Sequence, residues 1–182
     1  VHVSFPRSGS HCLQQILKLI LNSGESAKSY VDFVRKAPYL EKRVSEGMES
    51  LRLLRTHFSM DQIKVDPKAK YVYVARNPWD CCVSCYHYVR EMPVCEFQDG
   101  TFDVFLDVFL ERHFDFGDFF DHVLSGYRQR KERNAFFVTY EELQRDKEGS
   151  VLKLAWFLGE GYEETLEGHM QGEKKRFSFS SQ

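Results

Sequence analysis

The chain has 182 residues, of which 42% are hydrophobic and 29% are charged, so it is long enough for one domain with a buried core. Its formal net charge of −2 excludes a generally basic surface for nucleic acid, and no apolar run approaches the ~20 residues of a membrane span. The five cysteines are an odd number without the spacing of a disulfide framework, which favours free thiols and a cytoplasmic location.

Strands and helices alternate along the first half of the chain. Residues 1–5 form an extended apolar run, and a loop leads from it into a helix whose apolar positions extend from Leu13 to Leu21. A short apolar segment, residues 51–56, predicts a second strand. Residues 71–75 are mostly β-branched or aromatic, which predicts the clearest strand of the chain.

The alternation continues in the second half. Asn77 or Asp80 can cap a helix that runs to about Val89, with Pro78 tolerated in its first turn. Beyond it, the pattern predicts helices over 101–112, 117–133 and 150–158, a strand over 135–139, and a helix end at Gly159. The alternation predicts an α/β fold in which helices cover a parallel sheet.

The first loop has the composition of an anion-binding site. Gly9 lets the backbone approach a ligand closely, Ser8 and Ser10 offer hydroxyls, and Arg7 supplies a fixed positive charge. Backbone N–H groups and the dipole at the start of the following helix favour an anionic group such as phosphate. The loop lacks the G-x-x-x-x-G-K-[ST] pattern, so an ordinary nucleoside-triphosphate site is not supported, and plain turn chemistry with a helix cap stays an alternative.

A second polar cluster follows the strand at 71–75. Ligands of open α/β sheets gather at the carboxyl ends of the strands. Arg76 leaves this strand as a fixed cation and Ser84 brings a hydroxyl into the next helix, so both can meet a second phosphate group. The alternative is that Arg76 pairs with Asp80 to hold the turn, while Ser84 is a packed helix residue.

A third cluster ends the segment at 51–56. Arg55 and His57 lie two positions apart, so on an extended segment they share one face. A neutral histidine there can accept a proton from a substrate hydroxyl while Arg55 steadies developing negative charge. A surface or structural role for His57 is the alternative.

The three clusters together resemble the cytosolic sulfotransferase family, which moves a sulfuryl group from 3′-phosphoadenosine 5′-phosphosulfate (PAPS) to an acceptor hydroxyl or amine. The family's 5′-phosphosulfate loop reads approximately YPKSGTTW, and residues 5–12 read FPRSGSHC. Residues 76–87 match its 3′-phosphate motif, approximately RNPxDxxVSxYH, at every fixed position, and residues 55–59 resemble its catalytic segment KTHLP. Later segments resemble the family in the same order, to about Gly159.

The resemblance implies a fold and a set of roles. The fold is a P-loop NTPase-like three-layer α/β/α core with a central parallel sheet. His57 corresponds to the family's general base, and Arg7 and Arg55 stabilise charge on the transferring group. The residues expected to hold PAPS are Arg7, Ser8, Gly9, Ser10 and His11 at the 5′-phosphosulfate, Arg76 and Ser84 at the 3′-phosphate, and Tyr140 at the adenine end.

The resemblance also implies partners and boundaries. The acceptor is a small molecule such as a phenol, steroid, amine or alcohol, and Phe58, Tyr86 and Tyr88 are expected to form walls of its pocket. No nucleic acid, membrane or metal is expected. Residues 1–182 read as a single sulfotransferase domain that lacks the family's N-terminal and C-terminal segments, and the full-length protein is expected to form a homodimer.

This sequence departs from the family at three places. Arg7 stands where the loop has a lysine, and Cys12 stands where a tryptophan stacks on adenine. The family's late RKGxxGxWK segment has no counterpart, and the basic residues 172–176 are interpreted as a solvated charge run. A non-catalytic relative that binds PAPS or its product therefore stays open as an alternative. A nucleotide kinase is a second alternative, which the missing Gly-Lys-[ST] triplet disfavours.

Overall fold

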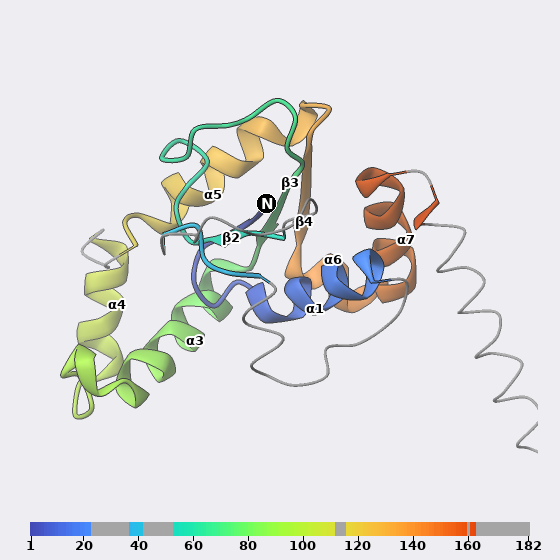
Figure 1. Cartoon of the computed structure of the whole chain (residues 1–182). Helices are drawn as coiled ribbons and strands as arrows, with labels where there is room; N and C mark the ends of the chain where they lie inside the picture. Colours follow the sequence, from blue (N-terminus) through green and yellow to red (C-terminus); the bar gives the residue numbers. More distant parts are fainter. Residues whose placement is uncertain (23–36, 42–52, 112–115, 160, 163–182) are drawn as a thin grey trace, which may run out of the picture.

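A parallel sheet lies at the centre of the protein (Figure 1). The computed structural model describes residues 1–22, 37–41, 53–111, 116–159 and 161–162. Within them, four strands pair in the order β2-β1-β3-β4, and all three pairings are parallel. The strands are β1 (His2–Ser4), β2 (Arg55–Thr56), β3 (Tyr71–Ala75) and β4 (Ala135–Thr139).

Helices connect the strands and cover both faces of the sheet. The helices in the described part of the chain are α1 (Ser10–Leu21), α3 (Pro78–Glu91), α4 (Phe102–Leu110), α5 (Phe119–Arg128), α6 (Tyr140–Arg145) and α7 (Lys147–Leu158), with 3-10 turns η1 (Pro93–Cys95) and η2 (Gln129–Lys131). Figure 1 shows α1, α6 and α7 on one side of the sheet and α5 on the other. This arrangement is the expected three-layer α/β fold.

Three groups of buried side chains hold the layers together. Leucines of α1 and α7 pack against Val72, Val74 and Val138 on one face of the sheet. Tyr71 and Tyr73 pack on the opposite face. A third group joins α3, α4 and α5 around the buried ring of Phe5, the residue that follows β1. All five residues of β3 are buried, as expected for a central parallel strand covered on both faces.

Several helix boundaries differ from those that the sequence pattern predicts. The last helix begins at Lys147 rather than Ser150, because the Asp146 side chain caps it by accepting from Gly149 N–H. A short helix, α6, precedes it and is held by a capping box between Thr139 and Glu142. The helix expected over 117–133 ends at Arg128 and continues as the turn η2.

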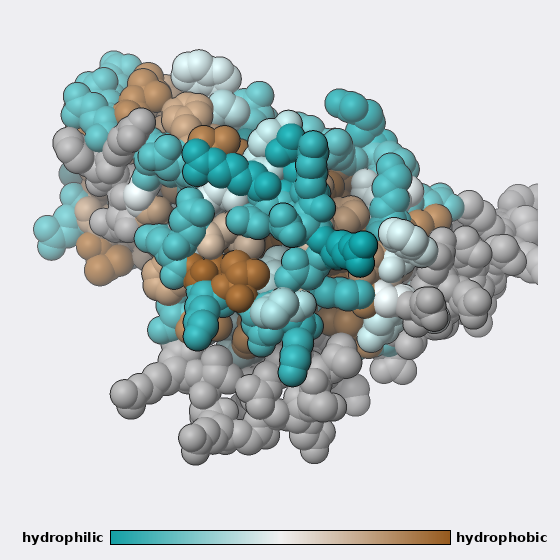
Figure 2. All heavy atoms as spheres, turned by 90° about the horizontal axis from the view of Figure 1, so that it is seen from above, coloured by the Kyte–Doolittle hydropathy of each residue, from teal (hydrophilic) through white to brown (hydrophobic). Residues whose placement is uncertain are grey.

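Some sequence predictions fall on residues that the structure does not describe. These are the start of the segment at 51–56, position 112 and the charge run at 172–176. In the described part, the strand of that segment is limited to Arg55–Thr56. None of the helices there has the length and apolar composition needed to cross a membrane. Figure 2 shows one face of the molecule, on which hydrophobic atoms gather in separate patches among hydrophilic ones.

The topology brings the three polar clusters to one edge of the sheet. Because the strands are parallel, their carboxyl ends lie together. The loop after β1 starts α1, the loop after β2 begins with His57, and Arg76 follows β3 directly. Tyr140 follows β4 directly as the first residue of α6. The polar side chains that the sequence singles out therefore gather at this edge.

Candidate functional site

The loop between β1 and α1 adopts a conformation that suits a glycine at its end. Arg7 and Gly9 both have positive φ angles, 65° and 98°, and Gly9 is the N-cap of α1. A Cβ atom on Gly9 would lie 2.5 Å from Cδ2 of the Tyr140 ring. Gly9 thus permits both the turn and the close approach of Tyr140. Because of this turn, α1 starts at the edge of the sheet.

Buried thiols of α3 hold the same loop from behind. The Cys81 thiol donates to the carbonyl of Pro6 at 3.3 Å, and Cys85 lies 3.7 Å from the same oxygen. The Ser8 hydroxyl is fully buried and lies 3.6 Å from Cys81 Sγ. Ser10 Oγ lies 2.7 Å from the Ser4 hydroxyl. Ser8 therefore fixes the loop through its side chain, which is turned into the protein.

Two guanidinium groups meet over this loop. Arg7 Nε donates to Ser84 Oγ at 3.0 Å, and its guanidinium carbon lies 5.1 Å from the centroid of the Tyr88 ring. Arg76 Nη1 donates to the Arg7 carbonyl at 3.1 Å and its guanidinium lies 4.9 Å from the Tyr140 ring centroid. Arg76 Nε is buried and has no hydrogen-bond partner among the described residues. The pair concentrates positive charge at the sheet edge.

The geometry of His57 assigns its tautomer. Nδ1 lies 2.8 Å from the carbonyl oxygen of Ser4, and because a carbonyl only accepts, Nδ1 carries the proton. Nε2 then holds the lone pair and accepts from the hydroxyl of Tyr39 at 3.3 Å. Burial lowers the pKa of His57 below its ordinary value, against the opposing effects of the Ser4 bond and the Glu41 charge. His57 is therefore neutral near pH 7, with a basic nitrogen available.

Glu41 and His122 fix the backbone that carries His57. Glu41 Oε1 accepts from His57 N–H at 2.8 Å and from Thr56 Oγ1 at 2.7 Å. Burial acts to raise the pKa of Glu41, but these hydrogen bonds hold it below its usual range. On the other side, His122 Nε2 donates to the His57 carbonyl at 3.0 Å while its Nδ1 accepts from Tyr73 at 2.6 Å. Burial lowers the pKa of His122 to about 4, so this support stays neutral.

Arg55 lies beneath this arrangement. Its side chain is 5% exposed, and Nη1 donates to Gln14 Oε1 at 2.8 Å. The guanidinium carbon lies 3.9 Å from the centroid of the Tyr39 ring. Both residues thus contact Tyr39: Arg55 lies over the face of its ring, and His57 accepts a hydrogen bond from its hydroxyl.

A cavity of about 540 Å³ joins these groups. It is lined by Arg7, Gly9 and Arg76 at one part and by His57, Phe58 and Tyr39 at another. The predicted site residues that line it are Arg7, Gly9, Ser10, His11, His57, Phe58, Arg76, Tyr88 and Tyr140. A cavity of this size suits a ligand as large as a nucleotide or a drug.

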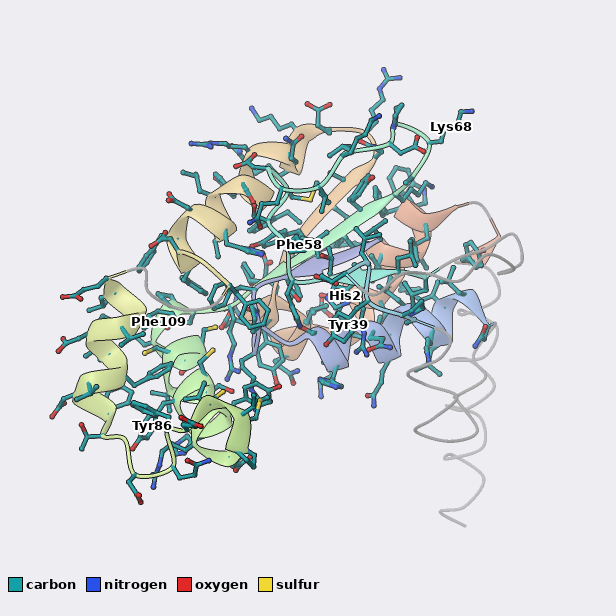
Figure 3. All side chains as sticks on the ribbon, turned by 60° about the vertical axis from the view of Figure 1, so that its left-hand side comes forward. His2, Tyr39, Phe58, Lys68, Tyr86 and Phe109 are labelled. Atoms are coloured by element: carbon teal, nitrogen blue, oxygen red, sulfur yellow. The ribbon has the colours of Figure 1, made fainter. Side chains whose placement is uncertain are left out.

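Four predicted site residues lie outside the lining of this cavity. Ser84 contacts the lining residue Arg7, and Arg55 contacts the lining residue Tyr39. Ser8 contacts Cys81, whose thiol in turn donates to the carbonyl of Pro6 at the edge of the cavity. Tyr86 lies elsewhere, because its hydroxyl donates to the Gly100 carbonyl at 3.1 Å and its ring packs against Phe102. Figure 3 shows Tyr86 among α3 and α4, away from Tyr39 and Phe58.

The sequence analysis did not assign Pro6, Tyr39, Glu41 or Phe116 to the site, although all four line the cavity. Tyr39 reaches the site because its backbone forms a parallel bridge with Arg55, a long-range contact with no local sequence signal. Cys12 also lines the cavity and accepts from Gln144 Nε2 at 3.8 Å. Among the residues that the structure describes, no three His, Cys, Asp or Glu side chains come together as a metal site.

The sequence matches a family model over its whole length and known proteins over most of it. Residues 1–182 match the family model described as a sulfotransferase domain. Human sulfotransferase 2B1 is 36% identical over 165 residues, which are 86% of this chain and 45% of that protein. Rat sulfotransferase 1 family member D1 is 31% identical over 168 residues, 85% of this chain and 57% of that protein. The chain spans about half the length of these curated relatives.

Solved structures share the fold. A retinol dehydratase in complex with androsterone and the inactive cofactor PAP has a TM-score of 0.74 at 21% identity, over 91% of this chain and 61% of that one. Mouse sulfotransferase SULT7A1 complexed with PAP has a TM-score of 0.63 at 27% identity, over 86% of this chain and 56% of that one. These likenesses confirm the expected P-loop-like α/β fold class. With a family model matched from Val1 to Gln182, the chain belongs to the sulfotransferase family.

Proposed function

We propose that the protein containing this chain transfers a sulfuryl group from PAPS to a hydroxyl or amine of a small-molecule acceptor, with His57 as the general base. One observation carries the proposal. The basic nitrogen of a neutral histidine opens on the same cavity as two arginines and a helix N-terminus. A proton acceptor and an anion site in one cavity are what group transfer from a charged donor to a hydroxyl requires.

The residues at the sheet edge fit PAPS. The buried Nε of Arg76 lacks a partner among the described residues, which suits a group rich in acceptor oxygens. Gly9, the N-cap of α1, lines the cavity together with Arg7, so the start of the helix and a fixed positive charge lie at the same place. The complexes of related folds with PAP support a nucleotide donor here. When bound, PAPS supplies the sulfuryl group and a phosphate leaving group.

Different residues of the chain would bind different parts of PAPS. Arg7, Ser10, His11 and the backbone around Gly9 would bind the 5′-phosphosulfate, and Ser8 would hold the loop. Arg76 would bind the 3′-phosphate, and Ser84, next to it, would orient Arg7. Tyr140 would contact the adenine end. As in phosphoryl transfer, positioning and fixed positive charge should supply most of the rate enhancement.

His57 would take the acceptor's proton at Nε2. The Nδ1–H bond to Ser4 holds the ring in the tautomer that leaves Nε2 basic. Because burial lowers its pKa, the imidazole is unprotonated near pH 7 before the acceptor arrives. Protonation in the course of transfer is then favoured by the nearby carboxylate of Glu41.

The walls near His57 indicate a flat, apolar acceptor. Tyr39, Phe58 and Phe116 line the cavity together with His57. The Phe116 ring lies edge-on to His57, with centroids 5.7 Å apart. A phenol or steroid alcohol could lie between such rings with its hydroxyl at Nε2. A cytoplasmic location and a homodimer of the full-length protein belong to the same proposal.

The test is sulfuryl transfer from labelled PAPS by the full-length protein, measured against a panel of phenols, steroids and amines. A general base contributes about 10²–10⁴-fold, so His57→Ala should lower kcat by that factor while PAP binding measured by calorimetry stays within about twofold. Activity of His57→Ala close to the wild-type value would refute the assignment of the base. Tight PAP binding by the wild-type protein without transfer to any acceptor would favour a non-catalytic relative instead.

A further inference from the structure

Tyr39 reaches the base through a backbone contact that adds its segment to the edge of the sheet. Arg55 N–H donates to the Pro38 carbonyl at 3.1 Å, and Leu40 N–H donates to the Arg55 carbonyl at 2.8 Å. These two bonds form the parallel bridge between Tyr39 and Arg55. The backbone of Tyr39 is therefore fixed beside β2, and His57 is the residue that directly follows this strand.

The Tyr39 side chain is clamped between two groups of the site. Arg55 lies over the ring at 3.9 Å, and Gln14 holds Arg55 in that place at 2.8 Å. The rings of Tyr39 and His57 have centroids 5.3 Å apart and are inclined at 47°. With its ring held in this way, the tyrosine directs its hydroxyl at Nε2 of His57, 3.3 Å away. Figure 3 shows Tyr39 and Phe58 at the same part of the molecule.

The contact has a chemical consequence because Nε2 has a single lone pair. That lone pair must face the acceptor hydroxyl when the proton is taken. In the resting protein the same lone pair accepts from Tyr39. Tyrosine and acceptor hydroxyls therefore compete for one position.

Resting on the function proposed above, we propose that Tyr39 is a positioning residue whose hydroxyl holds Nε2 of His57 in its reactive orientation and gives way to the acceptor hydroxyl. In the exchange, the bond from the Tyr39 hydroxyl to Nε2 breaks and an equivalent bond from the acceptor forms. Tyr39 keeps its own proton throughout. The acceptor thus enters a place that the protein has already shaped for a hydroxyl.

The same bond affects the protonation of His57. A donor to Nε2 stabilises the neutral imidazole, so its loss should raise the pKa of His57. Replacing Tyr39 by phenylalanine keeps the ring under Arg55 and removes only this donor. The titratable and charged groups around His57 that the replacement leaves in place are Arg55, Glu41, His2, His11 and His122.

The experiment compares wild type and Tyr39→Phe in the full-length protein. The imidazole of His57 is titrated by NMR, with its signal identified by loss in His57→Ala. We expect the His57 titration in Tyr39→Phe to move up by about half to one pH unit, as the loss of one neutral hydrogen bond implies. The acid limb of kcat/KM should move by the same amount. Tyr127→Phe, an exposed tyrosine of α5, should change neither.

The outcomes separate this inference from the proposed function. Coincident His57 titrations in wild type and Tyr39→Phe would overturn it. An equal loss of activity at every pH would do the same, because a purely structural role predicts that result. A shifted titration in a protein that transfers no sulfuryl group would leave the hydrogen bond in place, but would overturn both the proposed function and the exchange with an acceptor.

Discussion

Arg55 and Arg76 have different surroundings, and their expected tasks differ accordingly. Arg76 lines the cavity and Arg55 does not, although each carries a buried Nε without a partner in the described residues. Arg55 lies behind Tyr39, and its charge acts on His57 by helping to lower the pKa of the imidazole. We therefore expect Arg76 and Arg7 to face the donor's anionic groups, and Arg55 to act on the base rather than on the transferring group.

His2 is a second histidine whose burial has a measurable consequence. It lies on β1 opposite Arg55, is 1% exposed, and neither ring nitrogen has a partner in the described part of the chain. Burial, helped by the charges of neighbouring groups, lowers the pKa of His2 to about 3. A histidine in the unfolded chain has a pKa near 6.5, so the unfolded state binds this proton first as the pH falls.

The stability of the fold should therefore fall between pH 6.5 and about 3, and His2→Leu should reduce that fall. One proton of difference is worth about 1.4 kcal/mol per pH unit, so the slope between pH 6 and 4 should drop by about 1 kcal/mol per unit. Urea unfolding of both proteins at several pH values measures it. His87→Leu removes an exposed imidazole as the control. Equal slopes for wild type and His2→Leu would show that His2 is not the source.

At the scale of elements, the turn from β1 to α1 determines the shape of the anion site. Its backbone is held by α3 through the carbonyl of Pro6, and Gly9 completes the turn at a φ angle of 98°. Tyr140, at the start of α6, packs where a Cβ of Gly9 would be. The turn into α1 and the start of α6 therefore meet at Gly9, and α3 holds the same turn three residues earlier, at Pro6.

Gly9→Ala should damage binding as well as stability. An alanine in the left-handed region costs about 1–2 kcal/mol, and its Cβ would displace Tyr140. Gly117→Ala is the matched control, because Gly117 has a φ of 79° and a Cβ there meets nothing within 4 Å. Thermal unfolding should show a loss for both variants, the larger one in Gly9→Ala because of the contact with Tyr140, whereas PAP affinity measured by calorimetry should fall at least tenfold only in Gly9→Ala. Equal PAP affinities would place the nucleotide away from this turn.

Local sequence patterns predicted which helices and strands form better than they predicted where each one begins and ends. The strand at Tyr71–Ala75 was predictable because a β-branched and aromatic run is buried on both faces. The helix α6 was missed because it is short, although Thr139 and Glu142 have the spacing of a capping box. The early start of α7 depends on Asp146, whose capping role is evident only once its side chain is placed.

For the molecule as a whole, sequence order along a parallel sheet was enough to predict most of the site. Arg7, His57 and Arg76 each follow a strand, so the topology brings them to one edge. Tyr39 could not be predicted, because it reaches His57 through a single bridge to Arg55. Tyr86 was expected in the acceptor pocket but packs between α3 and α4, since its side chain points to the other side of a helix.

We expect this sheet edge to bind a nucleotide that carries a 3′-phosphate beside the base. Calorimetric titration of the full-length protein with adenosine 3′,5′-bisphosphate and with adenosine 5′-monophosphate tests it most directly. Charge-assisted bonds from Arg76 predict that the bisphosphate binds at least tenfold more tightly, and that Arg76→Ala removes most of this difference. Equal affinity of the wild-type protein for the two nucleotides would contradict the claim.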